Sequence, residues 1–155
     1  MVDSEKLAYK NLLKRWALDL ITQRITTSRQ AIDQAQQAAN QEEKSSAGDK
    51  YETGRAMGHL QKDMHARQLA ESIKELATLH AINAESLYPT AGPGAYIRCK
   101  DIAFFIAAGL GKQEPEGEII YFLSPQAPLA KGLQNKKPGD TFVFSNTTIT
   151  ILEIF

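Results

Sequence analysis

The chain has 155 residues, of which 43% are hydrophobic and 23% are charged, and its formal net charge is zero. This length fits one or two small domains, and a zero net charge gives no general attraction to nucleic acid or to a membrane surface. The single cysteine, Cys99, excludes an internal disulfide and is typical of a reducing compartment. No signal peptide and no apolar run of about 20 residues is visible, so the sequence predicts a cytoplasmic protein that does not enter a membrane.

The composition changes near residue 85. Residues 1–85 contain no proline and are rich in Ala, Gln, Glu, Lys and Leu, whereas all six prolines lie beyond them. This change predicts an α+β protein in which a helical part, 1–85, precedes a β-rich part, 86–155. Residues 86–94 are rich in proline and glycine and are expected to link the two parts.

Two long helices are predicted in the first part. The first begins at Asp3 or Ser4 and reaches about Gln41, and its apolar residues recur at the three, four and seven spacing of one helix face. They are Leu7, Leu12, Leu13, Trp16, Leu20, Ile21, Ile25, Ile32, Ala35 and Ala39. Because this stripe narrows to alanine, a partner helix can approach closely near its end. Trp16 is expected to pack where the helices meet the rest of the protein.

The second helix is predicted from about Lys50 to Ile82. Its apolar face carries Ala56, Leu60, Met64, Leu69, Ile73, Leu76 and Leu79. Neither helix can bury its apolar stripe alone, and only a short polar segment separates them, so the sequence predicts an antiparallel coiled-coil hairpin.

The second part reads as short strands with one short helix. The predicted strands are Ala95–Cys99, Ile102–Ala108, Glu118–Leu123, Thr141–Phe144 and Thr147–Ile154. A helical turn is expected over Leu129–Leu133, after Pro128, and a tight turn at Ser145–Asn146. Cys99 is expected to be a buried small side chain rather than a nucleophile.

The segment Gly48-Asp49-Lys50-Tyr51-Glu52 carries two acids, three residues apart, at the predicted tip of the hairpin. Carboxylates suit a Mg²⁺ ion, and an exposed pair suggests metal-assisted chemistry. The same spacing is also that of a capping box, with Asp49 as N-cap and Glu52 at the third helical position. The two readings are compatible and both stay open. Lys44, Lys50 and Arg55 lie nearby and either steer RNA phosphates or form an ordinary solvated helix face.

The C-terminal part also carries motifs. These are Ala127-Pro128-Leu129-Ala130-Lys131-Gly132-Leu133, then Lys136-Lys137-Pro138-Gly139-Asp140, then a final Leu152-Glu153-Ile154. Together with the tip motif and the order of the elements, they resemble the bacterial Gre transcript-cleavage factors. The resemblance implies a small FKBP-like C-terminal domain with an antiparallel sheet, which binds bacterial RNA polymerase at the rim of its secondary channel.

The resemblance also implies roles for particular residues. Asp49 and Glu52 would help to hold a Mg²⁺ ion shared with the polymerase active site, so that the polymerase cleaves backtracked RNA. The stretch Gln126, Ala127, Pro128 and Leu129 would contact the polymerase. The protein would then be an accessory factor, expected as a monomer, that meets the RNA 3′ end only indirectly and is not an enzyme by itself.

The chain differs from the Gre pattern at four points, one of which is a shorter segment between Ile106 and Ile119. Tyr51 stands where a serine is usual, Gln126-Ala127 replaces an Asp/Asn-Ser pair, and Thr53 begins a changed sequence after the tip. A regulator that binds the polymerase without stimulating cleavage therefore remains an alternative, as does a coiled-coil adaptor with an unrelated partner.

Overall fold

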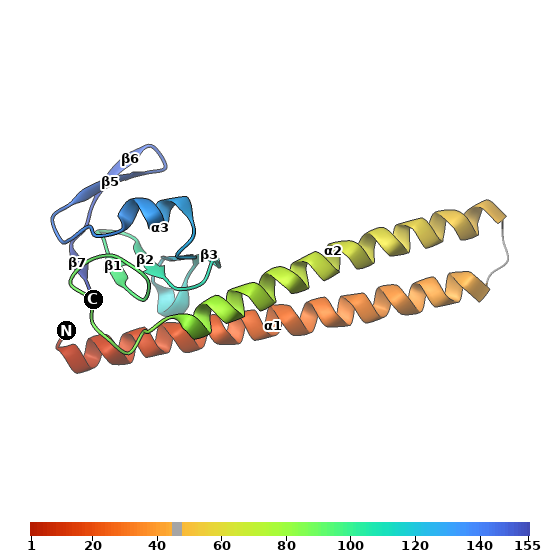
Figure 1. The fold of residues 1–155 in the computed structure, drawn as a ribbon, viewed down its shortest axis with the longest axis horizontal. Helices are drawn as coiled ribbons and strands as arrows, with labels where there is room; N and C mark the ends of the chain where they lie inside the picture. The colour runs from red at the N-terminus through yellow and green to blue at the C-terminus, as the bar shows by residue number, and fades with distance from the viewer. Residues whose placement is uncertain (45–47) are drawn as a thin grey trace. The chain divides into compact units, whose positions relative to one another are not determined.

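The computed structural model describes the backbone of residues 1–44 and 48–155 and, within these, the side chains of residues 1–41 and 53–155. Two long helices come first, followed by short strands and one short helix, as predicted (Figure 1). The helices are α1 (Asp3–Lys44) and α2 (Gly48–Ala81), and a later helix is α3 (Pro128–Leu133). No helix within the described residues is both long enough and apolar enough to cross a bilayer.

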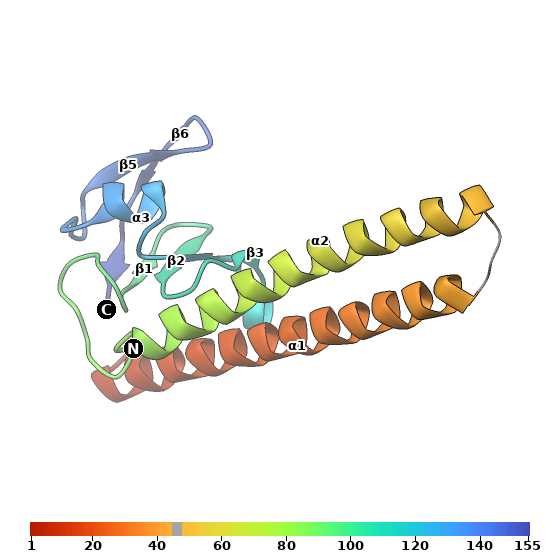
Figure 2. The same cartoon turned by 45° about the vertical axis from the view of Figure 1, so that its right-hand side comes forward.

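The chain divides into two compact units. One consists of residues 1–19 together with 75–155, and the other of residues 20–74. The first therefore contains the start of α1, the end of α2 and all the strands. The second contains only helix: within it α1 and α2 run side by side in antiparallel directions (Figures 1 and 2).

The first unit holds a five-stranded sheet in the order β3-β4-β2-β1-β7 and a separate two-stranded sheet, β5-β6. The strands are β1 (Tyr96–Arg98), β2 (Ala103–Ile106), β3 (Gly111–Gln113), β4 (Ile120–Leu123), β5 (Thr141–Phe144), β6 (Thr147–Thr150) and β7 (Glu153–Ile154). All neighbours are antiparallel except β2 and β4, which pair in parallel with Phe104 opposite Tyr121. The mainly antiparallel sheet with one short helix agrees with the sequence-based prediction.

The predicted last strand, Thr147–Ile154, is divided in two. Up to Thr150 it pairs with β5, and from Glu153 it pairs with β1. The change of partner is visible in two hydrogen bonds, from Ile151 N to Asp140 O (2.9 Å) and from Leu152 N to Arg98 O (2.9 Å). Ile149 is partly buried and Ile151 fully buried, so both side chains belong to the core.

Aromatic and aliphatic side chains from the strands and α3 form one core. Phe104 lies at its centre, with ring centroids 5.4 Å from Phe142 and 5.3 Å from Phe144. Ala130 and Leu133 of α3 pack into the same core, and Cys99 is 3% exposed, as expected for a structural thiol.

The start of α1 packs against the five-stranded sheet. Trp16 stacks on Phe122 with ring centroids 5.6 Å apart, which confirms its predicted packing role. Leu13 and Ala17, on the same side of α1, are fully buried. Burying such side chains contributes about 1.5–3 kcal/mol for each large one.

The proline- and glycine-rich segment after α2 is held in place by backbone hydrogen bonds. Ala91 N donates to Lys136 O (2.8 Å), and Gly94 N donates to Ile106 O (2.7 Å). Gly94 has φ +86°, and a Cβ atom added to it would lie 2.4 Å from Asn83 O. Both the backbone conformation and the close contact therefore require glycine at this position.

We expect Gly94→Ala to lower the free energy of unfolding by about 3 kcal/mol, because alanine meets both the left-handed backbone and the Asn83 carbonyl. Gly92→Ala is the matched control, since no atom lies within 4 Å of its added Cβ and its φ is ordinary. This control should change stability by less than about 0.5 kcal/mol. Urea unfolding of both variants measures the difference, and equal losses would contradict the prediction.

Lys10 is a buried charged residue of α1. It is 0% exposed, its Nζ donates to Ser86 O (2.7 Å), and it lies 4.6 Å from the centroid of the Tyr88 ring. Burial lowers the pKa of the Lys10 ammonium group from 10.5 to about 8. Lys14 makes a similar bond, to Ile82 O (3.1 Å), so two lysines of α1 hold the segment that follows α2.

This pKa shift predicts a pH dependence of stability. Below pH 8 Lys10 is charged in both the folded and the unfolded protein. Between pH 8 and 10.5 only the unfolded protein keeps the proton on Lys10, so the free energy of unfolding rises with pH in this range. Between pH 7 and 9.5 the rise should be about 2 kcal/mol. Urea unfolding across this range should show it in the wild type and not in Lys10→Met. The difference between the two proteins removes the contribution of other groups, and parallel pH curves would disprove the assignment.

Candidate functional site

The tip motif lies at the start of α2. The helix begins at Gly48, one residue before Asp49, and Glu52 follows in its first turns. The side chains of Lys44, Asp49, Lys50 and Glu52 lie outside those that the structure describes. The predicted Mg²⁺ ligands, the capping box and the phosphate-steering lysines therefore stay predictions. Arg55, the first described member of the group, is exposed to solvent.

The predicted polymerase-contacting residues form a compact turn before α3. Ser124 organises it, because its carbonyl accepts a hydrogen bond from Ala127 N (3.0 Å) and its Oγ accepts one from Gln126 N (3.2 Å). Ala127 is extended (φ −63°, ψ 143°), and Pro128 begins the helix, where the missing N–H group costs nothing.

The turn exposes some side chains and anchors others. Gln126 and Pro128 are exposed, whereas Ala127 and Leu129 are partly buried and pack against the core. The four residues that the sequence singles out thus lie together as one surface element, in which Gln126 and Pro128 are the groups available to a partner.

The helix pair of residues 20–74 has a seam that differs from the predicted one. Three α1 residues seven positions apart, Ile21, Ser28 and Ala35, are buried. The α2 residues with reduced exposure include Gly58, Lys62, His65, Leu69 and Ser72, which follow the three and four spacing of a coiled coil.

The predicted α2 stripe is correct in this unit only at Leu69, which lies on the seam. Leu60 is 69% exposed, Met64 48% and Ile73 45%, and Ala56 is also exposed. Close to Ala39 the seam holds Gly58, whose added Cβ would lie 3.6 Å from Ala39 Cβ. Lys62 Nζ also bonds across the pair to Gln36 Oε1 (2.8 Å). The close approach expected near the alanines is confirmed, although with a different α2 face.

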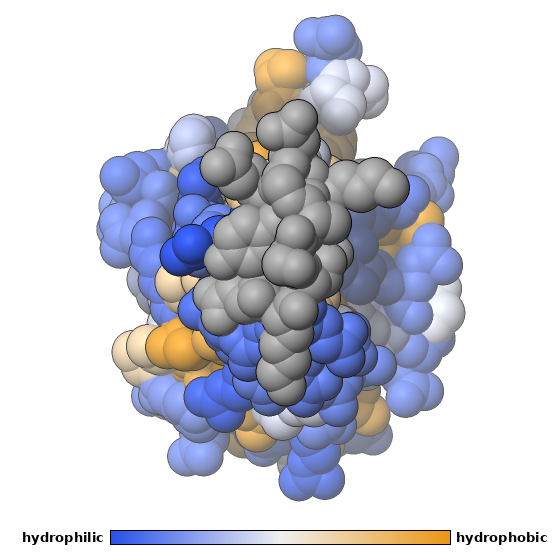
Figure 3. All heavy atoms as spheres, turned by 90° about the vertical axis from the view of Figure 1, so that its right-hand side faces the viewer, coloured by the Kyte–Doolittle hydropathy of each residue, from blue (hydrophilic) through white to orange (hydrophobic). Residues whose placement is uncertain are grey.

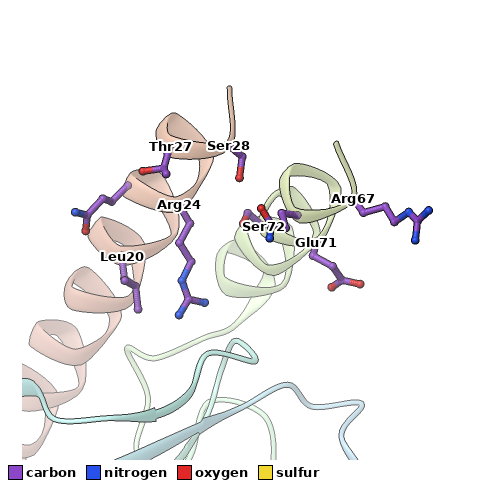
Figure 4. Close-up of a pocket in the computed structure, with 9 residues that line it drawn as sticks. Leu20, Arg24, Thr27, Ser28, Arg67, Glu71 and Ser72 are labelled. Atoms are coloured by element: carbon purple, nitrogen blue, oxygen red, sulfur yellow. The ribbon is translucent and has the colours of Figure 1, made fainter. Parts of the chain in front are cut away.

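A groove of about 660 Å³ lies between these helices (Figure 4). Arg24 of α1 extends toward the space between the helices, whereas Arg67 of α2 points away from α1. Because the two guanidinium groups do not converge, the groove does not form a clamp for an anion. In the view of Figure 3 the described surface is mainly hydrophilic, with separate hydrophobic patches.

A polar cluster in the first unit has no counterpart in the sequence prediction. Glu118 accepts hydrogen bonds from two tyrosines: Tyr9 OH reaches Oε2, and Tyr96 OH lies 2.6 Å from Oε1. Burial, followed by the bond to Glu118, raises the pKa of both tyrosines. Tyr9 and Glu118 are 109 residues apart, so no local pattern could indicate their contact. Because the pKa values are raised, both tyrosine hydroxyl groups stay protonated. The cluster joins α1 to the sheet, which suits a structural role.

Among residues 1–41 and 53–155, no three His, Cys, Asp or Glu side chains lie close enough together to hold a metal ion.

No protein-family model matches the sequence, and no curated protein matches it. Among solved structures, that of the transcription factor Gfh1 is similar over 89% of this chain and 92% of the other, with 15% sequence identity and a TM-score of 0.38. A match at this identity and TM-score assigns neither a family nor an activity to the chain.

Proposed function

We propose that the protein is a Gre-like transcription factor that binds bacterial RNA polymerase in the cytoplasm and stimulates cleavage of backtracked RNA. The observation that carries the proposal is the position of the Gly48-Asp49-x-x-Glu52 motif at the start of the second of two long paired helices. The C-terminal motifs around Pro128 and Gly139 support it, since they resemble the same family.

The proposed chemistry needs only the two carboxylates of the tip. Asp49 and Glu52 supply oxygen ligands of the type that Mg²⁺ prefers, and two such groups leave room for ligands from the polymerase. When bound between the two proteins, Mg²⁺ would stabilise negative charge on the oxygens of the RNA phosphate under attack. In this proposal the chain is an accessory factor, and the polymerase remains the enzyme.

Binding to the polymerase is assigned to the turn before α3. We expect Gln126→Arg to weaken binding to purified bacterial core RNA polymerase by at least about tenfold. Gln126 is an exposed side chain of the proposed contact surface, so a larger, charged side chain there would disturb the interface. Gln134→Arg, at the other end of α3, is equally exposed and should bind like the wild type. Biolayer interferometry measures both. Equal affinities of the two variants would remove the turn from the interface, and no binding of the wild type would overturn the proposed function.

A second candidate function is a polymerase-binding regulator that does not stimulate cleavage. Tyr51 within the tip motif favours it, because a bulky ring stands where the Gre factors carry a serine. In that case the protein binds the polymerase and changes RNA synthesis whether or not Asp49 is intact. The cleavage assay described in the Discussion separates the two functions.

A further inference from the structure

The outer edge of β6 is free to pair with another strand. β5 and β6 form a two-stranded sheet around the turn at Ser145 and Asn146, whose φ angles are 49° and 61°. This turn fixes the register, with Phe142 opposite Ile149 and Val143 opposite Thr148. Because bonded and non-bonded pairs alternate, Thr148 and Thr150 direct their backbone N–H and C=O groups away from β5. No described residue donates or accepts a hydrogen bond at this edge.

The edge also lacks three of the features that commonly prevent strand pairing. Residues 147–150 read Thr-Thr-Ile-Thr, without a charge, a proline or a bulge. Natural proteins generally protect an exposed edge with such features. An unprotected edge next to a cavity is therefore suited to accept a strand.

A cavity of about 650 Å³ lies along β6. The turn of residues 99–102 faces β6 across it, and Tyr121 and Phe144 contribute an aromatic wall, with ring centroids 4.8 Å apart. At one end the hydrogen bond from Leu152 N to Arg98 O joins the two sides, and Leu152 is 49% exposed there. The volume is within the range of ligand-binding clefts in proteins.

The charges around the cavity restrict what it can bind. Lys100 and Asp101 are its only charged lining residues within the described chain; they are adjacent, exposed and opposite in sign. The remaining lining residues are neutral, so the cavity offers no net charge to an ionic ligand. It complements a polypeptide backbone, which presents N–H and C=O groups at strand spacing, together with an aliphatic side chain for the aromatic wall.

We propose that this cavity binds an extended peptide segment of a partner protein, added as a strand to the outer edge of β6. An aliphatic side chain of the peptide lies against Tyr121 and Phe144. β6 has four residues, which span about 13 Å and match about four residues of ligand. None of the residues 124–129 lines the cavity, so this site is separate from the turn assigned to polymerase binding.

The test is an NMR titration of the ¹⁵N-labelled full chain with the peptide acetyl-Lys-Val-Thr-Leu-Thr-Val-amide. Saturable shifts of the Thr148, Thr150 and Lys100 amides are expected below about 1 mM peptide. Two N-methylated forms of the peptide, one for each alternating set of amides, distinguish strand addition from simple apolar contact. Only one of the two sets should weaken binding, by at least about tenfold, because only one edge of an added strand faces β6.

Two proline variants complete the experiment. Thr148→Pro removes the outward N–H group of β6 and should weaken peptide binding by at least about tenfold. Proline is tolerated on an edge strand, but it cannot donate a hydrogen bond to an added strand. Val143→Pro removes the equivalent outward N–H on the far edge of β5 and should bind the peptide within about twofold of the wild type. No saturable shift, equal effects of both methylated peptides or equal effects of both prolines would overturn the proposal. Shifts of the same amides with protein concentration alone, together with a doubled mass in ultracentrifugation, would assign the edge to a second copy instead.

Discussion

Asp49→Ala and Glu52→Ala each reduce transcript cleavage by at least about 100-fold if the tip motif supplies Mg²⁺ ligands, while binding to the polymerase is unchanged. The reason is that each carboxylate removed is a ligand of a metal held mainly by others, so its loss affects the chemical step rather than the affinity. The measurement is the shortening of 3′-backtracked RNA by stalled bacterial polymerase with the protein added, over a range of Mg²⁺ concentrations.

Asp63→Ala is the matched control for this experiment, because Asp63 is an exposed carboxylate further along α2. This variant should stimulate RNA cleavage by the polymerase as strongly as the wild type does. That result would exclude a general effect of helix charge on cleavage. A wild-type protein that binds the polymerase and leaves backtracked RNA intact at every Mg²⁺ concentration would favour the non-cleaving regulator. A capping role alone would instead lower the helix content of the variants without a Mg²⁺-dependent effect on cleavage.

Glu118→Ala lowers the free energy of unfolding by about 3 kcal/mol, the largest effect we expect from a single polar residue. Tyr96 is 1% exposed, so its hydroxyl group would lose its acceptor and could not turn to water instead. Tyr9 would lose the same acceptor. Chemical denaturation measures the change, with Glu114→Ala as a control because Glu114 is exposed and its side chain forms no cap bond.

A combined variant tests the mechanism of this loss. Glu118→Leu together with Tyr9→Phe and Tyr96→Phe removes all three polar groups, so no hydroxyl is left without a partner, and at least half of the lost stability should return. If Glu118→Ala cost less than about 1 kcal/mol, or if the triple variant were less stable than Glu118→Ala, the cluster would not contribute as described.

The sequence predicts the elements whose evidence is local. The lengths of α1 and α2, the short helix after Pro128 and the turn at Ser145–Asn146 follow from spacing, proline and turn residues, and the structure confirms them. Trp16 could be assigned to packing because a large aromatic residue on an apolar stripe needs a partner, and it has one in Phe122.

What the sequence does not predict depends on contacts between distant segments. The parallel pairing of β2 with β4 and the change of partner after Thr150 arise from tertiary packing, which leaves no periodic signal. Hydrophobic spacing predicts the α2 seam correctly at Leu69, whereas Leu60 and Met64 are exposed and Gly58 lies against Ala39. For the candidate site, the sequence predicts the tip motif and the contact residues around Gln126. It does not predict the hydrogen bonds from Gln126 N and Ala127 N to Ser124 that hold this turn.

The mixed composition of the seam in residues 20–74 affects how the protein opens. Ser28, Lys62, His65 and Ser72 replace aliphatic residues there, so this helix pair buries less apolar surface per turn than the aromatic core around Phe104. Regions with little apolar burial exchange their amide hydrogens through local opening at a lower free energy than the whole protein. The helix pair of residues 20–74 is therefore the part of the protein that we expect to open first, before the strands and the start of α1.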